Sequence, residues 1–264
     1  MIEFRDLIKT FHRGSINEVL ALAGINLQVA KGEFITVIGS NGAGKSTLLN
    51  CLSGSYPIDS GHIRIDEQDV SRWPEYQRAT LLSRVFQDPL LGTCTALSIE
   101  QNLALANRRG RGHGLGKGVK RSDRELFRHQ LAQLGLGLEM RLKDQVGLLS
   151  GGQRQALTLL MATLVKPKVL LLDEHTAALD PKTAQQVLEL TQQLISEQQL
   201  TALMVTHNMK QALQLGNRLI MLHGGRIILD VADKEKSAMT IEVLLEQFYK
   251  VRGEEFVSDR MLLV

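Results

Sequence analysis

The sequence predicts an α/β fold built on a mainly parallel sheet with helices on both faces. Two observations carry this prediction. Apolar, β-branched runs of strand length alternate with helical patterns over much of the chain. One such run, at 34–38, leads into a glycine-rich loop and then into a helical pattern at 45–52. This order of strand, loop and helix is typical of a phosphate-binding unit, and the 264 residues suffice for one such domain with its own core.

The glycine-rich loop fits the pattern G-x-x-x-x-G-K-[ST] without a mismatch. Glycines let the backbone wrap around phosphate oxygens with its N–H groups pointing inward, and the following helix N-terminus adds partial positive charge. We expect Lys45 to reach the β- and γ-phosphates of ATP and Ser46 to hold Mg²⁺. The predicted nucleotide-binding residues of this loop are Gly39, Ser40, Asn41, Gly42, Ala43, Gly44, Lys45, Ser46 and Thr47.

An acidic pair follows a second apolar run, at 169–172. Four consecutive apolar residues are typical of a strand that is buried on both faces of a parallel sheet. We expect Asp173 to face the Mg²⁺ shell through water, and Glu174 to orient and polarise the attacking water. The alternative is that Asp173 only caps a helix after the strand, but this leaves Glu174 unexplained.

A third motif makes the sequence resemble the nucleotide-binding subunits of ATP-binding cassette (ABC) transporters. It lies at the start of an apolar helical run at 156–165, so its amides are expected at a helix N-terminus suited to anions. In the family this signature contacts the γ-phosphate held by the other subunit. The resemblance therefore implies an ATP-dependent, head-to-tail homodimer. The predicted signature residues are Leu149, Ser150, Gly151, Gly152 and Gln153.

Four further residues match family motifs by their position. Gln87 resembles the glutamine that touches the metal and senses the transmembrane partner, and Asp180 resembles the D-loop aspartate. His207 resembles the switch histidine that contacts the γ-phosphate. Phe11 stands where the family has an aromatic residue stacked on adenine, although an aromatic in a first strand is commonly a core residue. The resemblance thus implies Glu174, His207 and Lys45 as catalytic residues, and Ser46, Gln87 and Asp173 as metal residues.

His175 departs from the common family pattern, in which proline follows the catalytic glutamate. The run Asp-Glu-His-Thr-Ala-Ala-Leu-Asp at 173–180 resembles a smaller branch of bacterial import-type ATPases. In one interpretation His175 is a second titratable group whose charge responds near neutral pH. In the other it is a tolerated loop residue that points away from the phosphate. We favour the second, because the proline of relatives does no proton chemistry.

The resemblance implies a single nucleotide-binding domain, a P-loop fold with a mainly parallel sheet, an N-terminal antiparallel β segment and an inserted helical subdomain. The expected parts are a RecA-like core with its β subdomain at 1–85 and 151–230, a helical subdomain with the signature at 86–150, and a short tail at 231–264. Within them we expect strands at 61–65, 201–205 and 218–222, a hairpin turn at Gly224-Gly225 and a tail helix at 240–250.

Positive charge is concentrated at 107–128, which contains eight basic and two acidic residues. The net charge of the whole chain is only +3. Five glycines between 110 and 118 argue against a stable helix, so we expect a mobile basic loop. It could touch anionic lipid headgroups or an acidic permease surface. We favour a plain solvated loop. The basic residues are Arg108, Arg109, Arg111, Lys117, Lys120, Arg121, Arg124 and Arg128.

Composition agrees with a globular protein outside the bilayer. The hydrophobic share of 44% is ordinary. No apolar run approaches the ~18 residues of a membrane helix, and the N-terminus lacks the layout of a signal peptide. Cys51 and Cys94 lack metal-ligand spacing, and no disulfide is expected. We therefore expect a cytoplasmic protein at the inner face of the cell membrane.

The resemblance implies a subunit that hydrolyses ATP to energise transport of a small solute through a separate transmembrane permease. We expect uptake, with an amino acid as cargo. We also expect a solute-binding protein in the same system. The alternative is an ABC-type ATPase that acts on nucleic acid or ribosomes, which the basic run supports through phosphate attraction. Relatives of that kind carry a long coiled coil or a second cassette, and this sequence shows neither pattern. Specific nucleic-acid binding is therefore not expected.

Overall fold

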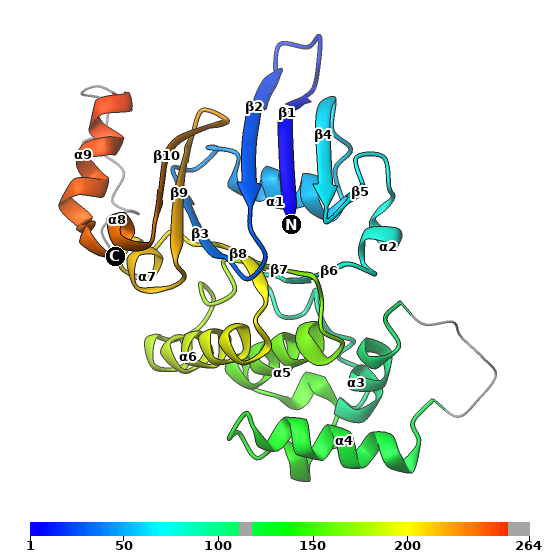
Figure 1. Cartoon of the computed structure of the whole chain (residues 1–264). Coiled ribbons are helices and arrows are strands. Elements are labelled where there is room, and N and C mark those ends of the chain that lie inside the picture. The colour runs from blue at the N-terminus through cyan, green and yellow to red at the C-terminus, as the bar shows by residue number, and fades with distance from the viewer. Residues whose placement is uncertain (111–117, 253–264) are drawn as a thin grey trace. The chain divides into compact units, whose positions relative to one another are not determined.

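The computed structural model describes residues 1–110 and 118–252, of which 251 and 252 are described by their backbone alone (Figure 1). The chain divides into two compact units, Met1–Arg78 with Thr201–Val264, and Ala79–Leu200. These bounds differ from the division at residues 86, 151 and 231 that the resemblance implies, and that division stays a prediction.

An antiparallel sheet of four strands opens the first unit. Its order is β2-β1-β4-β5. Side chains on β1 alternate between the core and solvent, with Ile2 and Phe4 about 1% exposed, as a sheet with one buried face requires. The predicted N-terminal antiparallel segment is confirmed. Its strands are β1 (Ile2–Phe11), β2 (Val19–Val29), β4 (Ser60–Ile65) and β5 (Gln68–Asp69).

A second group of strands in this unit is mainly parallel. β3 (Phe34–Gly39) pairs in parallel with β8 (Thr201–Val205) and with β9 (Arg218–His223). β3 and β8 are buried along their whole length, as the apolar runs predict. β10 (Arg226–Ala232) returns antiparallel to β9. The predicted hairpin turn between them is confirmed, with φ of +51° and +73° at Gly224 and Gly225.

The two helices predicted for the first unit, at 45–52 and 240–250, are present as α1 and α9. The predicted tail helix is confirmed as α9, where Leu244 and Phe248 pack with Ile38 and Met221. The helices of this unit are α1 (Lys45–Ser53), α2 (Glu75–Arg78), α7 (Met209–Gln214), α8 (Asp233–Ala238) and α9 (Ile241–Arg252).

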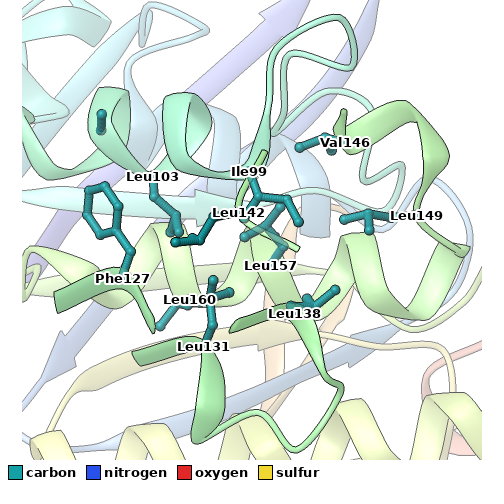
Figure 2. Packing of buried hydrophobic residues seen from close by; sticks show 11 residues of the cluster. Ile99, Leu103, Phe127, Leu131, Leu138, Leu142, Val146, Leu149, Leu157 and Leu160 are labelled. Carbon is teal, nitrogen blue, oxygen red and sulfur yellow. The ribbon is translucent and has the colours of Figure 1, made fainter. Parts of the chain in front are cut away.

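The second unit pairs β6 (Leu82–Val85) in parallel with β7 (Val169–Asp173) and adds a cluster of helices. Figure 2 shows the core of that cluster, in which Leu103, Phe127 and Leu157 point toward one another and are fully buried. The helices are α3 (Ile99–Asn107), α4 (Arg121–Ala132), α5 (Gly151–Leu164) and α6 (Pro181–Gln198), with short 3₁₀ turns η1 (Leu138–Met140) and η2 (Val146–Leu148).

The expectation of a basic loop across 107–128 is wrong for its last part, because α4 already begins at Arg121. The glycines end at 118, and the sequence from 121 has helical periodicity, with Phe127 and Leu131 buried on one face. Asp123 also accepts a hydrogen bond from the Lys120 amide at 2.8 Å, which caps the helix. Arg111 and Lys117 lie outside the described residues.

No helix in the described ranges is both long enough and apolar enough to cross a bilayer.

Candidate ATP site

The glycine-rich loop connects β3 to α1 in a backbone conformation that only glycine fits. The φ angles are +152° at Gly39, +75° at Gly42 and +101° at Gly44. A Cβ at Gly39 would lie 2.3 Å from the Leu222 carbonyl oxygen, and one at Gly44 would lie 2.4 Å from that of Ala21. The loop therefore lies tightly against neighbouring backbone, with its path fixed before any ligand binds.

Lys45 lies back over this loop. Its side chain is buried, and Nζ donates to the carbonyl oxygens of Gly39 at 2.8 Å and Ser40 at 3.0 Å. The ammonium group is thus held at the loop, where it suits the phosphates of a nucleotide. Ser46 is exposed in the first turn of α1, where the helix dipole favours anions.

The other end of α1 is held by Arg78, which sequence reasoning missed. Its buried guanidinium donates to the carbonyl oxygens of Cys51 at 2.6 Å and Leu52 at 3.1 Å. A cation at a helix C-terminus interacts favourably with the helix dipole. Burial lowers the pKa of Arg78 from its usual value. The helix that carries Lys45 and Ser46 is therefore fixed at both ends.

His207 and the glycine-rich loop lie at the same edge of the first unit. β3 and β8 are parallel neighbours, with Val37 opposite Val205, so both strands end at this edge. His207 is half-buried between β8 and α7, at the carboxyl end of the strands, where open α/β sheets bind ligands.

Phe11 ends β1 as a half-buried side chain. The Tyr56 ring meets it edge-on at 5.3 Å between centroids, and Lys9 Nζ lies 5.4 Å from its ring centre. These contacts hold the ring in place. Stacking on adenine stays a prediction.

The second unit brings Gln87 to the same edge as the acidic pair. β6 and β7 are parallel, with Val85 opposite Leu172, and exposed Gln87 follows β6 as Asp173 and Glu174 follow β7. This arrangement agrees with the order of motifs in the sequence, and the roles of these residues stay predictions.

Asp173 is paired with Arg84, a partner that sequence reasoning also missed. Arg84 Nη2 donates to Asp173 Oδ2 at 2.5 Å, and the two side chains are 11% and 14% exposed. The Arg84 guanidinium lies 4.8 Å from the centre of the Phe86 ring. An arginine within a short strand was the available signal, since a charge buried in a sheet needs a partner.

Glu174 has an unusual backbone. Its φ is +47°, in the left-handed region that residues with a side chain rarely adopt. The turn continues with a hydrogen bond from the Ala177 amide to the Glu174 carbonyl at 2.9 Å. Such conformations cluster at active sites.

His175 is a core residue of the second unit. It is 1% exposed, and its Nε2 lies 3.0 Å from Thr191 Oγ1 on α6. Burial lowers the pKa of His175 to about 4. The interpretation of a charge that responds near neutral pH is therefore wrong, because desolvation keeps the ring neutral there. The favoured interpretation of a loop residue agrees with its place in the turn after β7. The side chain is nevertheless packed and hydrogen-bonded, and whether a substitution is tolerated stays a prediction.

Gly151, Gly152 and Gln153 begin α5 with Ser150 as its N-cap, so the signature lies at a helix N-terminus as predicted. Ser150 caps the helix by accepting from the Gln153 amide at 3.3 Å, and Gln153 Oε1 accepts from the Ser150 amide at 3.2 Å. Leu149 is buried. Gly152 packs on α6 so closely that a Cβ would lie 2.0 Å from Thr183 Cγ2. Ser150 and Gly151 remain exposed.

Asp180 caps α6 by accepting from the Thr183 amide at 3.1 Å. Hydrogen bonds from Thr183 hold the pKa of Asp180 below its usual value. The D-loop aspartate of the prediction is thus also a structural helix cap.

The donor groups suit Mg²⁺ held mainly by nucleotide phosphates. Ser46 in the first unit, and Gln87 and Asp173 in the second, each offer an oxygen ligand of the kind that this cation prefers. Mg²⁺ is commonly bound by one or two protein groups plus phosphate oxygens, and the binding of one ion by these residues stays a prediction. Within residues 1–110 and 118–252, no cluster of three or more His, Cys, Asp or Glu side chains could hold a metal ion.

A profile of the ABC transporter family matches residues 22–177. The chain belongs to this family. The tyrosine transport ATP-binding protein of Clostridioides difficile is 47% identical over 248 residues, covering 94% of this chain and 98% of that protein. This ABC protein is thus the ATP-binding subunit of a transporter, and it hydrolyses ATP.

Two further likenesses extend this result. The methionine import ATP-binding protein MetN of Rhizobium johnstonii is 36% identical over 211 residues, which cover 79% of this chain and 56% of that protein. The chain therefore spans about half of that relative. The dimeric post-hydrolysis structure of the ATP-binding cassette MJ0796 with ADP and Pi has a TM-score of 0.74 and 27% identity, covering 88% of this chain and 98% of that one. The predicted ABC ATPase fold is confirmed.

Proposed function

We propose that this ABC ATPase acts as a head-to-tail homodimer that energises uptake of a small solute, with an amino acid as cargo, through a separate transmembrane permease. The observation that carries the dimer is the exposed N-terminus of α5 at Ser150 and Gly151, a helix end suited to a phosphate. The dimeric cassette MJ0796 supports it.

Each copy binds ATP on its own glycine-rich loop, and the signature of the partner copy covers the γ-phosphate. Glu174 orients and polarises the attacking water, while His207 and Lys45 stabilise the charge that develops on the γ-phosphate. Mg²⁺, when held by Ser46, Gln87 and Asp173, would neutralise phosphate charge. Hydrolysis opens the dimer, and Gln87 passes the motion to the permease.

The direction of transport and the cargo rest on relatives. Their names, tyrosine transport and methionine import, support amino-acid uptake by this chain. The His-containing run at 173–180 supports membership of an import-type branch. A solute-binding protein would deliver the cargo, and the ATPase would work at the inner face of the cell membrane. Transport of labelled tyrosine or methionine with the neighbouring permease genes tests this cargo class.

Glu174→Gln tests the catalytic assignment. The variant should bind ATP and Mg²⁺, form a stable dimer in size-exclusion chromatography and turn over little ATP, because the amide cannot polarise water as a carboxylate does. Glu197→Gln, at an exposed position on α6, is the matched control and should stay monomeric and active under the same conditions. Hydrolysis by Glu174→Gln near the wild-type rate would show that Glu174 is not the catalytic base.

The alternative of an ATPase acting on nucleic acid has less support than the charge count of the basic run suggests. That support was the basic run, but Arg124 pairs with Glu100 at 2.6 Å, and Arg109 donates to the carbonyl oxygens of Ala162 and Val165. These two cations make contacts within the unit, so fewer of the eight basic residues remain for a phosphate-binding surface.

A further inference from the structure

The turn after β7 holds Glu174 in a conformation that its own sequence does not favour. A glutamate at φ +47° crowds its Cβ against the backbone. Such a residue keeps this conformation only where its surroundings fix it. Whatever fixes the turn therefore also sets where the carboxylate of Glu174 can lie.

The neighbouring His175 is anchored to helix α6 by a hydrogen bond whose direction follows from chemistry. Thr191 Oγ1 donates its single proton to the Val187 carbonyl oxygen at 2.7 Å. The same oxygen can therefore only accept from His175 Nε2, at 3.0 Å. The ring must carry its proton on Nε2, which fixes one tautomer and one orientation.

The anchor is rigid because both partners are inside the unit. His175 and Thr191 are each 1% exposed. α6 spans 18 residues and buries Val187, Leu188 and Leu194 on the same face. A buried hydrogen bond of this kind cannot be replaced by water without cost.

We propose that His175 is a positioning residue, whose Nε2–H bond to Thr191 ties the catalytic turn to α6 and so holds Glu174 in its left-handed conformation. Thr191 is then a second positioning residue, 16 positions along the chain. The proposal rests on the proposed role of Glu174 in hydrolysis.

Thr191→Val removes the acceptor with little change in shape, whereas Thr191→Ser keeps it. Thr191→Val should lower kcat about tenfold with less than a twofold change in KM for ATP, because misplacing a catalytic group slows the chemical step more than binding. Thr191→Ser should restore most of kcat. Thr163→Val is the matched control: Thr163 is a buried threonine of α5 that donates to the Leu159 carbonyl oxygen at 3.0 Å, and its variant should keep the wild-type kcat.

A second pair of variants and a spectrum complete the test. His175→Gln keeps an N–H donor of similar reach and should retain more activity than His175→Leu. A long-range ¹H–¹⁵N spectrum of histidine-labelled protein at pH 7 should show the Nε2–H tautomer for His175, shifted in Thr191→Val and unchanged in Glu174→Gln.

Three results would overturn the proposal: a wild-type kcat in Thr191→Val, an equal loss in Thr163→Val, or an Nδ1–H tautomer at His175. Failure of the proposed catalytic role gives a different result. Glu174→Gln would then hydrolyse ATP while the spectrum still shows the bonded tautomer.

Discussion

Lys236 makes the stability of the protein depend on pH in a range where few groups titrate. This side chain of α8 is 3% exposed, and Nζ donates to the carbonyl oxygens of Leu215 and, at 2.9 Å, of Gly216. The third acceptor is Thr36 Oγ1 at 3.5 Å. All three acceptors are neutral, so burial lowers the pKa of Lys236 from 10.5 to about 8.

The sign follows from proton counting. The unfolded chain keeps the proton up to pH 10.5, whereas the folded protein releases it near pH 8. Between these values the unfolded state binds more protons, so the free energy of unfolding rises with pH. The gain is about 1 kcal/mol from pH 8 to 9 and about 2 kcal/mol from pH 8 to 10. This stabilisation is lost as the pH falls from 10 to 8.

Urea unfolding of the wild type and Lys236→Met at pH 7, 8, 9 and 10 measures this contribution. Burial raises the pKa of the Cys51 thiol from 9.0 to about 11, which gives an opposite slope above pH 9 in both proteins and cancels in their difference. Lys234→Met, on the exposed side of the same helix, is the control. A wild-type minus Lys236→Met difference that does not change with pH would refute the reasoning.

Two further substitutions follow from close contacts in the second unit. Gly152→Ala should lower stability by about 1–3 kcal/mol in urea unfolding, because its Cβ would lie 2.0 Å from Thr183 Cγ2; unchanged stability would contradict this packing. Arg84→Met should raise the affinity for ATP with Mg²⁺ relative to ATP without it, because a cation no longer competes for Asp173. Titration of a fluorescent ATP analogue with and without Mg²⁺ measures the ratio of the two affinities. An unchanged ratio would show that Arg84 does not compete with the metal for Asp173.

The parts of the fold that could be predicted are those whose signal is local. The run at 34–38 became β3, and the helix predicted at 45–52 became α1 at Lys45–Ser53, because hydrophobic periodicity and glycine steric constraints act within a few residues. The loop conformation at Gly39 and Gly44 also follows from the pattern, although the carbonyl groups that exclude a Cβ come from distant strands.

The parts that could not be predicted depend on partners far along the chain. His175 reads as a loop residue until Thr191 is placed beside it by α6. Arg84 needed β7 beside β6 before Asp173 could be its partner, 89 positions away. Burial and pairing of this kind are set by tertiary packing, which single-sequence patterns do not carry.

The basic run shows why a charge count alone does not define a docking surface. Arg109 binds the carbonyl groups at the end of α5, and Arg124 pairs with Glu100. Arg109 thus stabilises the end of α5, and Arg124 links α4 to α3. Burial lowers the pKa of Arg109 from its usual value. Replacing them would destabilise the helices along with any surface. The hypothesis of contact with anionic lipid is therefore better tested at Arg121 and Arg128, which are exposed on α4, where glutamine substitutions alter surface charge and leave the helix-end contacts intact.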